Sequence, residues 1–130
     1  MTHLYYVKTS YNHFTFKSLV DCGANISVIS SAMMHLLGLK AIRKAGVVYG
    51  VGGKAPLIGH KQCHICIGPM VTVDFQVLQS NQYSVILGLD FLEKYKCIIN
   101  TNTKKLYLNT YKIPFLNPKE LLLYKLPIKH

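Results

Sequence analysis

A short acidic turn between two apolar segments is the feature that most constrains this chain. Asp21-Cys22-Gly23-Ala24 follows a strand-like run at residues 14–20 and precedes another at residues 25–30. The sequence holds five acidic residues in all, and Asp21 comes directly after Leu-Val. A charge at the end of a buried strand costs free energy unless it is paired or hydrogen-bonded, so a protein that keeps one there often does so for a function. Asp21 is therefore the first candidate for a catalytic group.

The rest of the chain reads mainly as short strands separated by turn signals. Two short helices interrupt them. One is expected at residues 31–37, with Ser30 or Ser31 as N-cap and Gly38 as the stop, and one at residues 90–95. The pattern predicts a mainly β domain with strands at residues 4–7, 14–20, 25–30, 47–51, 56–59, 62–67, 70–78, 84–88, 97–100 and 105–108.

Length and composition favour a single folded domain. The 130 residues are 50% hydrophobic, which argues against a disordered chain. No apolar run approaches the roughly 20 residues that span a bilayer, and no signal-peptide pattern is seen, so no membrane contact is expected. The four cysteines are interpreted as reduced thiols, which predicts an intracellular location, in the cytoplasm or within a virus-like particle.

The expected domain covers residues 1–110. Residues 111–130 form a basic, Leu-rich segment that contains Pro114, Pro118 and Pro127. Because prolines interrupt regular structure, we interpret this segment as a C-terminal tail, a linker or a docking segment.

The chain is strongly basic, with 15 Lys and Arg residues against 5 Asp and Glu residues and a net charge of +10. Such a charge attracts anions, including RNA and DNA. The lysines are spread along the whole chain, however, and Arg43 is the single arginine. We expect weak nucleic-acid association at most, and a solvated basic surface as the simpler reading.

Two sequence blocks together resemble the retropepsin-like aspartic proteases. Residues 19–30, Leu-Val-Asp-Cys-Gly-Ala-Asn-Ile-Ser-Val-Ile-Ser, resemble the active-site strand and turn of retroviral-type enzymes. Residues 85–92, Val-Ile-Leu-Gly-Leu-Asp-Phe-Leu, look like the Ile-Leu-Gly-x-Asp segment of the same superfamily, closest in form to gypsy-type retrotransposon proteases and their domesticated cellular relatives. Two blocks in order, with a glycine-rich hairpin between them, are more specific than either alone.

The resemblance implies a fold and a set of site residues. The fold would be a closed β-barrel of the acid-protease half type, with a flap hairpin and one or two short helices. Asp21 would be the catalytic acid, within the active-site loop that continues through Cys22, Gly23 and Ala24. Gly23 would give the turn the freedom to bring backbone N–H groups toward the carboxylates. The flap tip would be Val51, Gly52 and Gly53, and the loop would be supported from beneath by Ile86, Leu87 and Gly88.

The resemblance also implies a mechanism. Aspartic proteolysis uses two adjacent carboxylates that share one proton. This chain carries one such motif, so a catalyst would be a homodimer with one Asp21 from each subunit. Its partner molecule would be an extended peptide with apolar residues around the scissile bond, or a polyprotein that contains this domain. No cofactor or metal is expected.

One position departs from the family pattern. The residue after the catalytic Asp is usually Thr or Ser, whose hydroxyl links the two loops across the dimer, and here it is Cys22. A thiol is a weak hydrogen-bonding group. This leaves an alternative function open: a retropepsin-fold module that has lost catalysis and serves dimerisation or protein binding.

Other signals have simpler explanations. Asp90 precedes a helix and is expected to be its N-cap, and Asp74 lies in an alternating strand and is expected to face solvent. Cys63 and Cys66 point to opposite faces of a strand, which argues against a zinc site. A cysteine-nucleophile role for Cys22 has no identified His partner.

Overall fold

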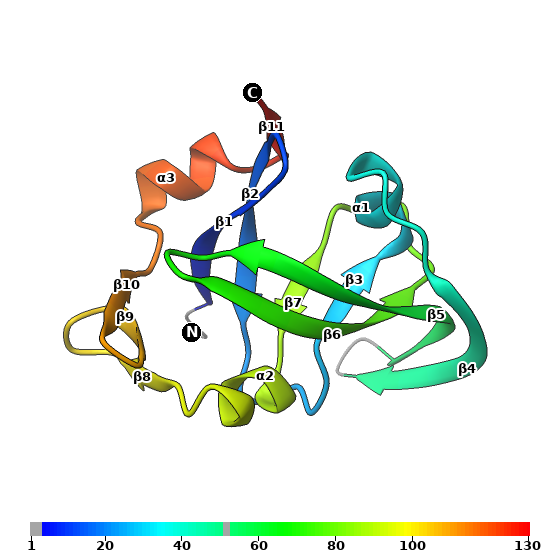
Figure 1. Cartoon of the computed structure of the whole chain (residues 1–130), viewed down its shortest axis with the longest axis horizontal. Coiled ribbons are helices and arrows are strands. Elements are labelled where there is room, and N and C mark those ends of the chain that lie inside the picture. Colours follow the sequence, from blue (N-terminus) through cyan, green and yellow to red (C-terminus); the bar gives the residue numbers. More distant parts are fainter. Residues whose placement is uncertain (1–3, 51–52) are drawn as a thin grey trace.

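The computed structural model describes residues 4–50 and 53–130, and strands dominate it (Figure 1). The elements follow one another in the order β1 (Tyr5–Tyr11), β2 (Phe14–Val20), β3 (Val28–Ser30), α1 (Ser31–Leu36), β4 (Ile42–Gly50), β5 (Gly53–Cys66), β6 (Met70–Leu78), β7 (Val85–Leu87), α2 (Leu89–Lys94), β8 (Ile98–Asn100), β9 (Lys105–Leu108), β10 (Tyr111–Pro114), α3 (Pro118–Leu123) and β11 (Ile128–Lys129). The predicted mainly β class is confirmed.

The main sheet has the strand order β1-β2-β7-β3-β6-β5-β4, and β11 pairs with β2. Strand β1 also pairs with β5, through Ser10 and Cys66, so the strand order returns on itself. A separate three-stranded sheet has the order β10-β9-β8. The strands expected at residues 97–100 and 105–108 are thus present as the pair β8 and β9, and β10 adds a third strand.

Strand β7 lies between β2 and β3, and this placement decides where the active-site turn lies. It is parallel to β2 and antiparallel to β3. The chain therefore has to pass the end of β7 on its way from β2 to β3. That connection is residues 21–27, and it lies against the residues that follow β7.

The core is built on the long β5–β6 hairpin, which crosses the middle of Figure 1. Alternate side chains on these two strands point inward, as the period of a strand requires. They include the buried residues Cys63, Ile65, Val71, Val73, Phe75 and Val77. Burial of each large apolar side chain stabilises the fold by about 1.5–3 kcal/mol.

The two predicted helices are present, with one correction. Ser30 is the N-cap of α1, its side chain accepts a hydrogen bond from the Met33 N–H, and Gly38 follows the helix at a φ of +70°. The N-cap of α2 is Gly88, not Asp90 as expected. Asp90 lies inside the first turn, where its Oδ1 accepts a hydrogen bond from the Phe91 N–H of its own helix at 2.7 Å. The same carboxylate also bonds to Ser27 in another segment of the chain.

The expected strand at residues 25–30 begins later, at Val28. The carbonyl oxygen of Asn25 accepts a hydrogen bond from the Asp90 N–H, at 3.2 Å. Hydrogen bonds to the start of α2 thus hold the first residues of this run in the connection. The β propensity of the run is overridden by these contacts.

The segment after residue 110 is folded against the first two strands. The Leu116 N–H donates to the Tyr6 carbonyl oxygen at 2.8 Å, and β11 pairs antiparallel with β2. Helix α3 has a capping box in which Asn117 and Glu120 each bond to the other's backbone N–H. The division at residue 110 stays a prediction, but this segment contributes structure to the domain.

None of the described helices is both long and apolar enough to cross a bilayer.

Candidate active site

Asp21 comes directly after β2, and its backbone continues the pairing with β7. The Asp21 N–H donates to the Leu87 carbonyl oxygen at 3.0 Å. The side chain is half-buried. Its Oδ1 accepts a hydrogen bond from the Gly23 N–H at 2.9 Å. The carboxylate is thus held at the end of the strand by its own turn.

A side chain at position 23 would crowd the Asp21 carboxylate. A Cβ at position 23 would lie 3.2 Å from Asp21 Oδ1, tighter than most such contacts. The φ of Gly23 is not among the positive values of the described glycines, so left-handed backbone is not a reason for glycine here. The Ala24 N–H closes the turn onto the Asp21 carbonyl oxygen at 3.2 Å. The Cys22 side chain is exposed.

The residues expected to support the turn, Ile86, Leu87 and Gly88, lie beside it, and their supporting role stays a prediction. Ile86 and Leu87 pair with the last two residues of β2, and Leu87 is fully buried. Gly88 is the point of closest approach: a Cβ there would lie 2.4 Å from the Ile26 carbonyl oxygen and 2.8 Å from that of Ala24. Since both contacts are to backbone, no other residue fits without moving the active-site loop. The Leu89 N–H adds a hydrogen bond to the Ala24 carbonyl oxygen at 2.7 Å.

Ser27 and Asp90 form a second link, which the sequence pattern does not predict. Ser27 Oγ donates to Asp90 Oδ1 at 2.7 Å, and the Ser27 N–H donates to Asp90 Oδ2 at 3.1 Å. Ser27 Oγ also accepts from the Gly88 N–H at 3.0 Å. Ser27 is fully buried. A serine at the start of a strand and an acid early in a helix are weak local signals, and their pairing is visible only in three dimensions.

The flap is partly described. Strands β4 and β5 form an antiparallel hairpin that ends in the pair Gly50 and Gly53. Gly53 has a φ of +106°, a value that L side chains rarely adopt, and is exposed. The other two predicted tip residues, Val51 and Gly52, lie outside the described residues. Position and shape match the expected flap, and the binding roles of all three residues stay predictions.

The remaining acids have other positions. Asp74 is exposed on β6, as expected, and accepts a hydrogen bond from the Gln62 side chain at 3.0 Å. Glu120 belongs to the capping box of α3, and Asp90 accepts a hydrogen bond from the Ser27 hydroxyl. Glu93 is exposed on α2. No second acid of the chain is therefore placed in a turn like that of Asp21.

The two cysteines considered for a zinc site, Cys63 and Cys66, differ in burial: Cys63 is buried and Cys66 is half-buried. Cys63 is buried, whereas its neighbour His64 points outward and bonds to Thr72 Oγ1 at 2.9 Å. No metal-ligand cluster is found among the residues that the structure describes. Burial raises the pKa of the Cys63 thiol to about 11, against a smaller opposing effect of Lys61, and burial likewise raises that of Cys97 to about 11.

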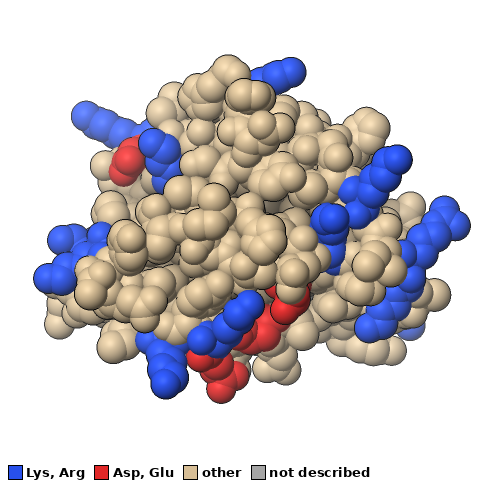
Figure 2. All heavy atoms as spheres, viewed as in Figure 1, with Lys and Arg blue, Asp and Glu red and all other residues tan. Residues whose placement is uncertain are grey.

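On the face seen in Figure 2, basic side chains do not form one continuous stripe. Figure 2 shows Lys and Arg side chains spread mostly around the rim of the face in view, with acidic atoms at its lower edge and at its upper left. A nucleic acid would need a continuous basic track to bind tightly. The distribution gives no such track on this face.

Comparison with protein families places the chain in a family. A family model described as "Aspartyl protease" matches residues 1–100. The chain belongs to the aspartyl protease family. In this chain, hydrogen bonds join the Asp-Cys-Gly-Ala turn at residues 21–24 to the Ile-Leu-Gly-Leu-Asp block at residues 86–90.

Relatives of this aspartyl protease include fungal and animal proteins. The "DNA damage-inducible protein 1" of Chaetomium globosum is 32% identical over 124 residues, which is 92% of this chain and 28% of that protein. The "Protein DDI1 homolog 1" of Caenorhabditis elegans is 28% identical over 124 residues, 89% of this chain and 31% of that protein. The chain therefore spans less than a third of the length of these relatives.

A solved structure matches over nearly the whole aspartyl protease chain. It is the crystal structure of the retroviral protease-like domain of Ddi1 from Leishmania major, with a TM-score of 0.80 and 25% sequence identity. The match covers 93% of this chain and 100% of that one. The predicted retropepsin-like fold is confirmed. None of these relatives carries a retrotransposon name, and that affiliation stays a prediction.

Proposed function

We propose that this chain is one subunit of a homodimeric aspartic endopeptidase. The observation that carries the proposal is the fixed position of the Asp21 carboxylate. The carboxylate ends a strand, is fixed through one oxygen by the Gly23 N–H, and stands on a loop clamped from beneath by Gly88. Such preorganisation of an acid is what catalysis requires.

Counting of acids supports the homodimer. Peptide hydrolysis by this chemistry needs two carboxylates that share a proton. The other four acids of the chain cap a helix, bond to neighbouring side chains or lie exposed on α2. The second carboxylate would then come from Asp21 of another copy, across a two-fold axis.

The two Asp21 carboxylates of such a dimer would hydrolyse a peptide bond by acid–base catalysis. One carboxylate takes a proton from a water molecule, whose oxygen attacks the scissile carbonyl carbon, while the other carboxyl donates its proton to the carbonyl oxygen. Collapse of the tetrahedral intermediate breaks the C–N bond, and the amine leaves with a proton from the pair. The β4–β5 hairpin would cover an extended peptide with apolar residues at the scissile bond.

Peptide cleavage by wild type and Asp21→Asn tests the proposal. The wild type should cleave apolar-centred peptides between about pH 4 and 7, the range in which a proton-sharing pair operates, and pepstatin-type compounds should inhibit it. Asp21→Asn should retain its circular dichroism spectrum and thermal unfolding but cleave nothing. Peptidase activity in that variant would end the proposal.

A second candidate rests on Cys22. Its exposed thiol stands where the family pattern has a hydroxyl that links the two loops. A dimerisation or protein-binding module without catalysis would tolerate this change. Peptide binding without turnover across the same pH range would favour it.

The remaining expectations concern the surroundings of the protein. A polyprotein substrate, an intracellular location and weak nucleic-acid association remain part of the proposal. For the last of these, affinity for RNA or DNA should fall steeply as salt rises.

A further inference from the structure

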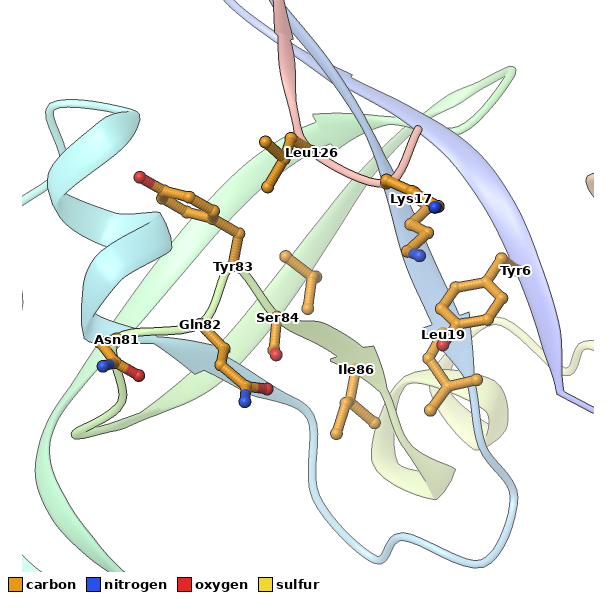
Figure 3. Close-up of a pocket in the computed structure, with 11 residues that line it drawn as sticks. Tyr6, Lys17, Leu19, Asn81, Gln82, Tyr83, Ser84, Ile86 and Leu126 are labelled. Carbon is orange, nitrogen blue, oxygen red and sulfur yellow. The ribbon is translucent and has the colours of Figure 1, made fainter. Parts of the chain in front are cut away.

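A hollow of about 530 Å³ lies beside β2, where Lys17 and Leu19 face it (Figure 3). Side chains along a strand alternate between its two faces. On β2, Phe16, Ser18 and Val20 are buried, whereas Lys17 and Leu19 face the hollow. Asp21 follows Leu19 by two residues and continues this outward row. The hollow is thus a direct extension of the site in which a peptide bond would be hydrolysed.

The part of the hollow nearest to Asp21 is apolar. Leu19 pairs with Ile86 across β2 and β7, and Figure 3 shows the two side chains side by side. Both are half-buried. This surface would accept an apolar substrate side chain next to the scissile bond.

The far part of the hollow is cationic. Lys17 Nζ lies 4.9 Å from the centre of the Tyr6 ring, which holds the ammonium group at the wall without neutralising it. The C-terminal segment adds Lys125, which is exposed. No acidic residue lines the hollow.

We propose that this hollow selects peptide substrates with an acidic side chain two residues beyond the apolar residue at the scissile bond, through Lys17 and Lys125. The inference rests on the proposed peptidase function and names its substrate class.

The spacing follows from strand geometry. Alternate residues of an extended chain are about 6.6–6.8 Å apart. Lys17 and Leu19 have this separation along β2, and so do same-side residues of an extended peptide. A peptide that runs alongside β2 with an apolar side chain on Leu19 would therefore place its next same-side residue at Lys17. A two-fold dimer would present one such hollow on each side of the scissile bond.

The selectivity is electrostatic. A carboxylate that reaches the two ammonium groups forms charge-assisted hydrogen bonds, which are roughly twice as strong as neutral ones. A glutamine of the same shape would keep the packing and lose the charge. The preference for the acid should shrink as ionic strength rises.

The experiment compares two peptides that differ at one position, where one has a carboxylate and the other an amide. Each has an apolar residue on either side of the scissile bond and, two residues outward, either Glu or Gln. With wild type, kcat/KM should be about tenfold higher for the Glu peptide. Lys17→Gln with Lys125→Gln should abolish this difference, and Lys17→Glu with Lys125→Glu should favour a peptide with Lys at that position. Lys112→Glu, at an exposed position on β10 outside the hollow, is the control and should retain the wild-type preference.

Binding of the same peptides to Asp21→Asn separates this inference from the proposed function. Fluorescence anisotropy should show tighter binding of the Glu peptide to that variant as well. Selective binding without any cleavage by wild type would overturn the peptidase and leave the inference standing. Equal cleavage and equal binding of the two peptides, or no binding of either, would overturn the inference.

Discussion

Ser27 and Asp90 are 63 residues apart in the chain and are joined by two hydrogen bonds, of 2.7 and 3.1 Å. This link fastens the end of the active-site loop to the first turn of α2. Since Asp21 lies at the other end of the same loop, the position of its carboxylate depends on this link and on Gly88.

Replacement of Ser27 by Ala should reduce both stability and activity. It removes the hydroxyl partner of Asp90 and of the buried Gly88 N–H, and an unsatisfied buried group costs about 1–3 kcal/mol. Chemical denaturation and kcat/KM measure the two effects. Ser18→Ala is a matched control, because Ser18 is equally buried and bonds to Thr9. It should lose similar stability and keep its kcat/KM, and equal loss of activity in both variants would contradict the role of the link.

A methyl group at position 88 should displace the active-site loop. The Cβ in Gly88→Ala would meet the Ile26 carbonyl oxygen at 2.4 Å, and overpacking of this kind costs about 1–3 kcal/mol. We expect a lower unfolding midpoint and a large loss of kcat. Gly38→Ala is strained by its φ of +70° but meets nothing within 4 Å, and it should lose stability alone. A fully active Gly88→Ala enzyme would show that the loop is not held from beneath.

Cys22→Thr should tighten the dimer. It restores a hydroxyl at the position where the family pattern places the link between loops, and a hydrogen bond contributes about 0.5–1.5 kcal/mol. Two symmetric bonds would lower the dimer Kd about fivefold to 150-fold, as measured by sedimentation. Cys66→Thr serves as control because its thiol bonds within the subunit, to the Gly68 carbonyl oxygen. An unchanged Kd in Cys22→Thr would show that this position does not contact the partner loop.

The fold was largely predictable because its signals are local. Strand alternation in β6, the Ser30 cap and the Gly38 stop each depend on neighbouring residues. Strand β5 departs from the prediction, because Gly53–Cys66 is one continuous strand where two were expected, at residues 56–59 and 62–67. Asp21 was found in the same way, from a turn that follows a strand. The later start of β3 and the true partner of Asp90 were not predictable, because both depend on contacts between segments far apart in the sequence. Pairing of the C-terminal β11 with β2 was missed for the same reason.

Thiol reactivity should separate the cysteines. Cys22 is exposed, whereas burial raises the pKa values of Cys63 and Cys97 to about 11, so both stay protonated at pH 8. Iodoacetamide should modify Cys22 rapidly and Cys63 slowly in the folded protein, and all four cysteines in denaturant. Mass spectrometry of the peptides measures this. Fast modification of Cys63 in the folded protein would contradict its burial.

The same shifts make stability depend on alkaline pH. Between pH 9 and about 11 the unfolded chain loses thiol protons that the folded chain keeps, so the free energy of unfolding should fall as pH rises through this range. The double variant Cys63→Ala, Cys97→Ala should show a smaller slope.

Mixing of wild type with Asp21→Asn tests the central claim, that each active site needs Asp21 from two copies. Equal amounts are refolded together, and peptide cleavage is compared with wild type alone at the same total concentration. Random pairing makes about one quarter of the dimers wild type in both subunits, so activity should fall to about one quarter. A fall to about one half would mean that each copy acts alone, and would contradict the account.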